Sequence, residues 1–369
     1  MTYEIFQGDC RELLRDLPDA CIDAIVTDPP YELGLMGKPW DSSGIAYNVA
    51  MWAECLRVLK PGGHLVAFGG TRTYHKMTCA IEDAGFAIRD SLHWIYGSGF
   101  PKSMNVEKSG AGEAWHGWGT ALKPAHEPIM CARKPIVGTV AANVLKHGTG
   151  AMNIDGTRVA FQSDDDKESA FPGGKLTSHG SGSLAGPGAA QEAQRSEFVA
   201  SQNESGRWPP NVLLSHTEDC EDQCAEDCPV AEMDRQSGSS VSKKGKPRDS
   251  VHPGDIWGMT KTGAEYDDAG GASRFFPCFR YHPKTSRKER DAGCEGIRAR
   301  HPTVKPIELM KWLVRLVTPP NGIVLDPFTG SGSTGVACML EGFNFVGFEQ
   351  SAEYVEIAEA RIGHAEMNK

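Results

Sequence analysis

The chain lacks the features of membrane-spanning and secreted proteins. No apolar stretch among its 369 residues approaches the roughly 20 residues that cross a bilayer, and no basic segment followed by an apolar one opens the sequence. Eleven cysteines are scattered along the chain without a secretion signal, which predicts reduced thiols and argues against a disulfide framework. We therefore expect a cytoplasmic protein, and a hydrophobic content of 40% is enough for a large core.

A surplus of positive charge is also missing. The sequence has 48 acidic and 38 basic residues, a net charge of −10, which is not typical of a generic nucleic-acid binder. Basic residues nevertheless gather between residues 274 and 305, where nine Lys or Arg outnumber three acidic residues. Two interpretations stay open for this segment: contacts to phosphate groups, or an ordinary solvated surface. The candidate phosphate contacts are Lys284, Arg287, Lys288 and Arg290.

The first motif with chemical content is Asp28-Pro29-Pro30-Tyr31. It follows directly on the apolar run of residues 22–27, so an acid and an aromatic ring are expected at the carboxyl end of a buried strand, where open α/β sheets bind ligands. The two prolines donate no backbone N–H, which leaves the Asp28 carboxylate and the Pro29 carbonyl as acceptors. Two acceptors beside an aromatic ring suit an amino group on a flat ring. The alternative is that the prolines only end the strand.

The second motif, at residues 324–335, is a short apolar run that passes into a glycine-rich turn and a helix. Gly330 and Gly332 allow positive φ and close approach of the backbone to a ligand. The lack of a lysine after the last glycine excludes a phosphate-binding loop, and the preceding Asp-Pro-Phe excludes the dinucleotide fingerprint. A second apolar strand ends at Glu349, where an acid can accept both hydroxyls of a ribose. The pattern predicts a nucleotide-type cradle.

Together the two motifs resemble those of the S-adenosylmethionine-dependent DNA amino-methyltransferases. In the β group of that family the catalytic motif precedes the cofactor motif and a target-recognition region lies between them, which is the order in this chain. Residues 301–306, His-Pro-Thr-Val-Lys-Pro, resemble the segment that the group closes over the methionine end of the cofactor, and residues 7–18 resemble its first strand and helix. Details of the middle region of the chain resemble phage-type members of this family. The expected location is therefore the cytoplasm of a bacterium or of a phage-infected cell.

The resemblance implies a fold, a cofactor and a partner. The expected fold is α/β, a doubly wound and mostly parallel sheet of the Rossmann-like methyltransferase type, in circularly permuted order and with a large insertion. The implied activity is transfer of a methyl group from S-adenosylmethionine to the N6 amino group of adenine in double-stranded DNA, by direct transfer to a flipped-out base in a specific sequence. Homodimers are common in the group, and many members serve restriction–modification.

The resemblance also assigns roles to individual residues. The catalytic set would be Asp28, Pro29, Pro30 and Tyr31, without a covalent cysteine step. The cofactor-binding set would be Asp326, Phe328, Gly330, Gly332 and Glu349 in and after the second motif, together with His301, Thr303 and Lys305 upstream of it. Asp9 would also belong to this set, and the alternative is that it is only an acid at the end of a strand.

Three other functions stay open. Methylation of cytosine N4 uses the same chemistry, and we prefer adenine because members acting on cytosine more often have Ser where Asp28 stands. An enzyme acting on RNA or on a protein amide would normally carry the cofactor motif first, contrary to this order. An inactive DNA-binding module would show a broken motif, and neither motif is broken.

Apolar periodicity predicts alternating strands and helices at both ends of the chain. Residues 1–135 are expected to form the catalytic part of a methyltransferase domain, residues 301–369 its cofactor-binding part, and residues 136–300 an inserted target-recognition region with mobile loops. The expected strands are residues 3–6, 21–26, 64–68, 88–96, 128–132, 324–325 and 343–348, the expected helices 49–59, 74–84, 306–317, 336–340 and 352–362, and the expected loops 162–206 and 236–271, with a short ordered island at 208–214 between them.

The middle region also holds four soft metal ligands at regular spacing: His216, Cys220, Cys224 and Cys228. Four ligands of this kind would suit tetrahedral zinc. In a helix, the first and last of the three cysteines would lie on the order of 12 Å apart, so a zinc site requires a looped segment. The alternative is three partly buried free thiols, and Cys278 and His282 are substitute ligands.

Overall fold

A computed structural model describes residues 1–34, 39–97, 99, 103–161, 206–217, 220, 224–225, 228–241, 269–279, 292–297, 301 and 303–369. The four predicted phosphate contacts, Lys284, Arg287, Lys288 and Arg290, lie outside the described residues, as does the substitute metal ligand His282. Most of the two predicted loop segments lie outside them as well.

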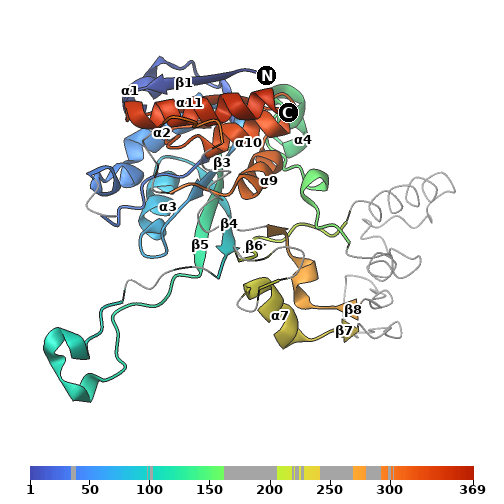
Figure 1. Ribbon diagram of the computed structural model, residues 1–369. Coiled ribbons are helices and arrows are strands. Elements are labelled where there is room, and N and C mark those ends of the chain that lie inside the picture. The colour runs from blue at the N-terminus through green and yellow to red at the C-terminus, as the bar shows by residue number, and fades with distance from the viewer. Residues whose placement is uncertain are drawn as a thin grey trace, which may run out of the picture. The chain divides into compact units, whose positions relative to one another are not determined.

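The described residues build one large sheet with helices packed around it (Figure 1). The sheet has nine strands in the order β1-β11-β10-β2-β3-β5-β4-β6-β9. In this order, the five strands β1, β11, β10, β2 and β3 are parallel to their neighbours, and so are β4, β6 and β9. Strand β5 lies between these two groups and is antiparallel to both β3 and β4. The mostly parallel α/β sheet expected from the sequence is thereby confirmed. The strands are β1 Tyr3–Gln7, β2 Ile22–Thr27, β3 Leu59–Phe68, β4 Ala87–Ile95, β5 His126–Arg133, β6 Val212–Ser215, β9 Cys278–Phe279, β10 Ile323–Asp326 and β11 Asn344–Glu349.

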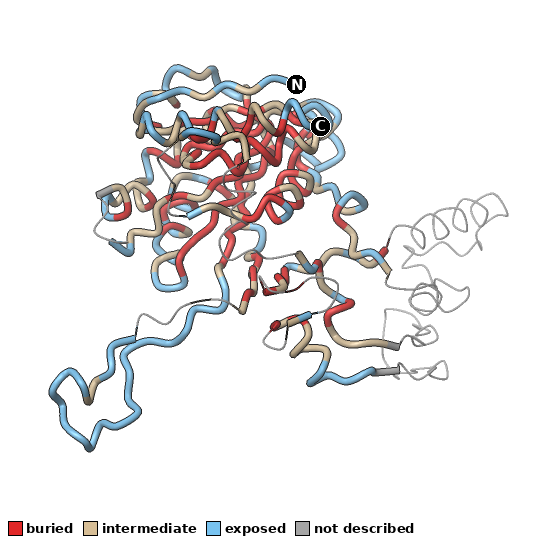
Figure 2. The backbone as a smooth tube through the Cα atoms, viewed as in Figure 1, coloured by how far each residue is buried: buried red, intermediate tan, exposed pale blue. Residues whose placement is uncertain are grey.

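Helices cover both faces of this sheet, and successive strand residues point to opposite faces. Val26 and Val66 belong to the core under α9, α10 and α11, whereas Ile25 and Leu65 belong to the core under α1, α2 and α3. Figure 2 shows the buried residues concentrated in these strands. None of the helices in the described part of the chain has both the length and the apolar character that a membrane crossing needs. The helices are α1 Cys10–Asp16, α2 Val49–Val58, α3 Tyr74–Asp83, α4 Val140–His147, α7 Pro229–Ser237, α9 Ile307–Val317, α10 Ser333–Glu341 and α11 Ala352–Met367.

The neighbouring strands β2 and β10 form the switch point of the sheet. From β10 the chain passes through α10 to β11 on one side, and from β2 it passes through α2 to β3 on the other side. In open α/β sheets the crevice outside the carboxyl ends of two such strands binds ligands. Asp28 directly follows β2, and Asp326 is the last residue of β10. The fold therefore brings together the two motifs that are far apart in the sequence.

Strand β3 begins five residues earlier than the sequence predicts, at Leu59 instead of His64. The segment Lys60-Pro61-Gly62-Gly63 predicts a turn, but Leu59 pairs with Ile22 across an irregularity in the strand register. Gly62 donates a backbone hydrogen bond to Lys134, and Gly63 accepts one from it. A Cβ at Gly63 would lie 2.9 Å from the carbonyl oxygen of Asp23. Gly62 itself has a φ of +82°, so the strand is kinked at this residue and the pairing with its neighbours continues beyond the kink.

The described residues divide into two compact units. The first comprises Met1–Thr157, Asn211–Pro229 and Cys278–Lys369 and holds the large sheet, and the second comprises Arg158–Pro210 and Val230–Pro277. The predicted ordered island contains β6, which belongs to the large sheet. In the second unit, β7 (Ser240–Val241) pairs with β8 (Ala269–Gly270). The assignment of residues 136–300 to target recognition stays a prediction.

Buried His64 on β3 is expected to make the protein less stable in mild acid. Burial, together with the charges of Arg133 and Arg89, lowers the pKa of His64 to about 4 from its usual 6.5. As the pH falls through 6.5 towards 4, the unfolded chain binds a proton that the folded chain does not bind. The free energy of unfolding then falls by about 2 kcal/mol between about pH 7 and pH 5.

The variant His64→Gln, with no titratable group at this position, isolates the effect. Urea unfolding of both proteins at the two pH values measures it, and the wild type should lose more stability than the variant. Equal losses in the two proteins would show that His64 binds its proton as readily in the folded state as in the unfolded chain.

Candidate active site

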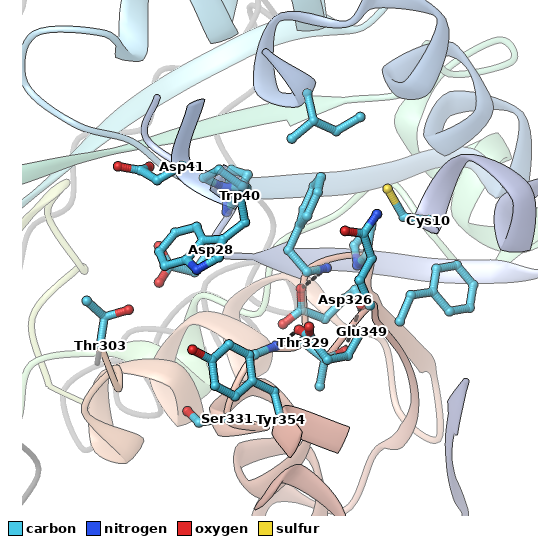
Figure 3. A pocket seen from close by; sticks show the side chains of 18 of the residues that line it. Cys10, Asp28, Trp40, Asp41, Thr303, Asp326, Thr329, Ser331, Glu349 and Tyr354 are labelled. Carbon is cyan, nitrogen blue, oxygen red and sulfur yellow. Dashed lines mark hydrogen bonds between the residues drawn. The ribbon is translucent and has the colours of Figure 1, made fainter. Parts of the chain in front are cut away.

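One pocket lies at the carboxyl ends of β2 and β10 and collects residues of both motifs. Its volume is about 620 Å³, which is in the range of sites for small molecules and cofactors. The predicted site residues that line it are Asp9, Asp28, Pro29, Pro30, Tyr31, His301, Thr303, Lys305, Asp326, Phe328, Gly330 and Glu349; several of them are drawn in Figure 3.

An ion pair with Lys305 holds the Asp28 carboxylate. The Lys305 Nζ lies 2.6 Å from Oδ2 of Asp28 and 3.5 Å from Oε2 of Glu127. Burial lowers the pKa of Lys305, but the charges of Asp28 and Glu127 raise it by more, so the amine remains charged. The other oxygen of Asp28, Oδ1, is buried and has no hydrogen-bond partner among the described residues. Because buried polar atoms are nearly always hydrogen-bonded, Oδ1 is an acceptor that a ligand can use.

Glu127, on β5, is a pocket residue that the sequence did not reveal. Its Oε2 accepts a 2.7 Å hydrogen bond from the Tyr31 hydroxyl, and its Oε1 accepts a 3.5 Å hydrogen bond from the Tyr96 hydroxyl. Burial, followed by the charges of Asp28 and Glu127, raises the pKa of Tyr31 well above its usual value, so the phenol stays protonated. A Cβ at Gly70 would lie 3.2 Å from the Tyr31 ring, so a glycine at this position avoids a tight contact with the ring. Glu127 thereby fixes Tyr31 in the pocket wall.

Gly330 and Glu349 form the cradle in the other part of the pocket. Gly330 has a φ of +51°, and a Cβ there would lie 3.1 Å from Nε2 of His301. The Gly330 N–H donates to Oε2 of Glu349 at 2.9 Å, and the Ser351 N–H donates to Oε1 at 2.8 Å. Burial raises the pKa of Glu349, whereas these amides lower it. Each carboxylate oxygen has two acceptor positions, so both can accept one further hydrogen bond from a hydroxyl group.

Asp326, predicted as a cofactor-binding residue, uses its carboxylate within the protein. Oδ1 accepts hydrogen bonds from the Thr27 hydroxyl at 2.6 Å and from the Phe328 N–H at 3.1 Å, and Oδ2 accepts one from the Thr334 hydroxyl at 2.6 Å. Burial raises the pKa of Asp326 to about 6, although these hydrogen bonds lower it. The side chain ties β2, the turn after β10 and the start of α10 together, and so shapes the cradle.

Two further predicted cofactor residues have clear structural roles. Gly332 does not line the pocket. Its φ is +77°, and a Cβ at this position would lie 3.0 Å from the Cα of Ala358. A glycine is therefore needed for α10 to begin in close contact with α11. Asp9 lines the pocket and also caps α1, where its Oδ1 accepts the Arg11 N–H at 2.9 Å. The side-chain hydrogen bond from Arg11 lowers the pKa of Asp9.

His301 and Thr303 lie together at the pocket. The His301 ring meets the Tyr354 ring edge-on with centroids 4.5 Å apart, and its Nδ1 contacts the carbonyl oxygen of Thr303. Burial lowers the pKa of His301 to about 4, so its imidazole is neutral near pH 7. A neutral imidazole from the segment upstream of β10 and a ring from α11 therefore meet at the cradle.

The four predicted metal ligands come together outside this pocket. One ligand atom from each of His216, Cys220, Cys224 and Cys228 lies within 4.8 Å of the other three. None of them lines the pocket. All four lie outside helices and strands, in the looped arrangement that a metal site at this spacing requires.

The pocket offers two kinds of binding group. Asp28 supplies an unsatisfied acceptor beside the ring of Tyr31, and Glu349 supplies two acceptors for a diol beside a glycine turn. These suit, respectively, an amino group on a flat ring and a ribose. Two ligands held side by side in this way can react by direct group transfer, without a covalent link to the protein.

Comparisons with known proteins agree with this geometry. The sequence model of the N6_N4_Mtase family, described as DNA methylase, matches residues 22–360. The chain is 34% identical over 116 residues to the type II methyltransferase M.HindIII of Haemophilus influenzae, a match that covers 28% of this chain and 38% of that protein. It is 38% identical over 81 residues to M.HinfI of Haemophilus influenzae, with 22% of each chain covered.

The curated relatives are thus matched over less than two fifths of their length. Among solved structures, the complex of M1.HpyAVI with SAM is similar over 98% of this chain and 99% of that chain, with 18% identity and a TM-score of 0.44. The family match, in contrast, extends over most of the sequence. The chain therefore belongs to the N6_N4_Mtase family of DNA methylases.

Proposed function

We propose that the protein is a site-specific DNA methyltransferase that uses S-adenosylmethionine to methylate the N6 amino group of adenine. The observation that carries the proposal is the shared pocket, in which the unsatisfied Oδ1 of Asp28 and the carboxylate of Glu349 both line one cavity of about 620 Å³. A cofactor and a purine base are the two ligands that this combination of acceptors fits. Family membership supports the same reaction class.

S-adenosylmethionine would occupy the cradle. Glu349 would accept hydrogen bonds from both ribose hydroxyls, because each of its oxygens already binds one amide and has one acceptor position left. Phe328 would contact the adenine or methionine portion, and Gly330 allows close approach of the backbone. His301 and Thr303 would cover the methionine end.

The target amino group would be held by Asp28 and the Pro29 carbonyl. The cofactor supplies an electrophilic methyl group on sulfur. Hydrogen bonds from the two N–H groups to these acceptors favour a tetrahedral nitrogen, so the nitrogen lone pair is free to form the new N–C bond while the bond between that carbon and sulfur breaks. Lys305 keeps the carboxylate in position, and Asp28 need not act as a strong base because the nitrogen loses its proton late. Catalysis is then mostly positioning of two bound reactants.

The target base must leave the duplex to reach this pocket. Tyr31 would provide the stacking face, and its hydrogen bond to Glu127 keeps the ring from turning away. We propose adenine over cytosine because an acid stands at position 28, where members acting on cytosine more often have Ser. Recognition of the DNA sequence is assigned to residues 136–300, with phosphate contacts from Lys284, Arg287, Lys288 and Arg290.

The experiment is a methyl-transfer assay with purified protein and methyl-labelled cofactor on unmethylated DNA, RNA and protein. Nuclease digestion and chromatography then identify the labelled nucleoside. N6-methyladenine from DNA is the expected product. N4-methylcytosine would keep the mechanism and overturn the choice of base, and label only in RNA or protein would overturn the proposal.

Lys305→Met is expected to lower kcat/KM for methyl transfer by roughly tenfold to a hundredfold. The variant removes the cation that lies 2.6 Å from Oδ2 of Asp28 and 3.5 Å from Oε2 of Glu127, so the proposed acceptor loses the partner that holds it in position. The measurement is kcat/KM for methyl transfer. Lys311→Met, which removes a lysine paired with Glu308 on α9, is the control and should keep the wild-type value. An unchanged kcat/KM in Lys305→Met would contradict the role assigned to this lysine.

A further inference from the structure

A second cluster of reactive side chains lies in the segment between β6 and α7, apart from the proposed active site. It consists of His216, Cys220, Cys224 and Cys228, with one ligand atom from each within 4.8 Å of the other three. Cys220 and Cys228 are buried, His216 is partly buried and Cys224 is exposed. The methyl-transfer chemistry uses none of these residues. Three thiols and an imidazole at such short distances are a ligand set for a soft divalent metal ion.

The distances fit one tetrahedral zinc ion. Zinc bonds of about 2.3 Å to sulfur and about 2.0 Å to nitrogen give a nitrogen–sulfur separation of about 3.5 Å along one edge of the tetrahedron. The Nδ1 atom of His216 lies 3.4 Å from Sγ of Cys224 and 3.5 Å from Sγ of Cys228. The imidazole therefore already presents one nitrogen to two sulfurs at the spacing that a shared ion requires.

The surroundings also suit a metal-bound thiolate at Cys220. Its sulfur lies 3.2 Å from the Thr217 hydroxyl and accepts a 3.3 Å hydrogen bond from the Ala225 N–H. Hydrogen bonds of this kind orient ligands and stabilise negative charge on sulfur in metal sites. Backbone hydrogen bonds hold two of the ligands, because the Cys220 N–H donates to the Thr217 carbonyl at 3.2 Å and the Cys228 N–H to the Ala225 carbonyl at 3.1 Å.

The cluster is joined to the wall of the catalytic pocket by short contacts. Ser215, which precedes His216, accepts a 2.8 Å hydrogen bond from the Trp94 indole, and Trp94 lines the pocket. A Cβ at Gly97 would lie 2.9 Å from Pro229 and 3.3 Å from Thr217, so the residues flanking the cluster pack directly on the chain after β4. The His216 N–H also bonds to the carbonyl of Phe279 in β9.

We propose that His216, Cys220, Cys224 and Cys228 bind one structural zinc ion that fastens the loop between β6 and α7 beside the target pocket. All four ligands come from the protein, so no position is left for a substrate or a reactive water, and the ion serves stability. Cys228 lies just before Val230, where the chain passes from the first compact unit back into the second. The zinc would thus anchor the chain at the point where it leaves the first unit.

The test is the zinc content of the full-length protein, purified without chelator from cells grown with zinc and measured by mass spectrometry. We expect about one zinc ion per chain. Cys224→Ser is the main variant, because Cys224 is the exposed ligand and its replacement disturbs packing least. Cys79→Ser, which changes an exposed cysteine on α3 outside the cluster, is the matched control and should keep the full content.

Replacement of the metal by cobalt gives a second readout that does not depend on activity. The wild type and Cys79→Ser should show the charge-transfer and visible bands of tetrahedral cobalt bound to thiolates, and Cys224→Ser should lose or alter them. Zinc removal should also lower the melting temperature of the wild type. A metal-free wild type, a disulfide between any two of the three cysteines, or equal zinc in Cys224→Ser and the wild type would overturn the proposal.

Discussion

Replacing Asp28 with alanine is expected to reduce the rate of methyl transfer by roughly a hundredfold to a thousandfold, with little change in the affinity for S-adenosylmethionine. The variant removes the only unsatisfied buried carboxylate oxygen found in the described part of the pocket, which is the proposed acceptor of the target amino group. The cradle around Glu349 is formed by other residues and remains. Single-turnover kinetics with labelled cofactor and calorimetry with S-adenosylhomocysteine measure the two effects separately.

The buried partner of Asp28 requires a second variant. Asp28→Ala leaves the Lys305 ammonium without its 2.6 Å partner, which is destabilising in a buried site. The double variant Asp28→Ala/Lys305→Met removes both charges and keeps the loss of activity separate from a loss of folding. Asp16→Ala, at the exposed end of α1, is the control for removal of a carboxylate. Wild-type rates in a folded double variant would exclude Asp28 from the reaction.

Replacing Glu349 with alanine is expected to weaken cofactor binding by roughly tenfold to a hundredfold. The variant loses the two proposed hydrogen bonds to the ribose and also the anchor of the Gly330 and Ser351 amides. The affinity for S-adenosylhomocysteine, measured by calorimetry, reports both losses. The rate at saturating cofactor should fall much less, because the acceptor for the target amino group stays in position.

Two variants sharpen the Glu349 result. Glu349→Gln keeps one acceptor oxygen and should bind with intermediate affinity. Glu356→Ala removes an exposed carboxylate from α11, only seven residues away, and should bind like the wild type. An unchanged affinity in Glu349→Ala would mean that the cofactor does not use this part of the pocket.

Much of the fold could be predicted because its signals are local. Alternation of apolar strands and amphipathic helices predicted the strands that both ends of the chain contribute to the sheet, and α9 follows the predicted limits closely. The early start of β3 could not be predicted, because Pro61 and Gly62 favour a turn. The contacts that make the segment part of the strand, Leu59 with Ile22 and Gly62 with Lys134, join residues distant in sequence.

The candidate site was predictable where a motif carries it and not where side chains converge in space. The sequence located Asp28 and Glu349, since both follow apolar strands with characteristic neighbours. Glu127 belongs to no motif and was missed; its position beside Tyr31 results from the pairing of β5 with β3. Lys305 was predicted near the methionine of the cofactor. Its ion pair with Asp28 could not be predicted, because the two residues are far apart in the sequence and only the fold places them together.

Metal ligands in the middle region illustrate the same limit. The spacing of His216, Cys220, Cys224 and Cys228 allowed both a zinc site and free thiols, because it does not say whether the chain is helical or looped. In the structure the four residues lie outside helices and strands, and one ligand atom from each lies within 4.8 Å of the other three.

The central claim is that residues from the two ends of the chain form one site for the cofactor and the target amino group. A crystal structure of the protein with S-adenosylhomocysteine tests it most directly. The ribose hydroxyls should lie about 2.7–3.2 Å from the Glu349 carboxylate, with the sulfur directed towards Asp28. A cofactor bound outside this pocket, or one whose ribose makes no contact with Glu349 and whose sulfur faces away from Asp28, would contradict this claim.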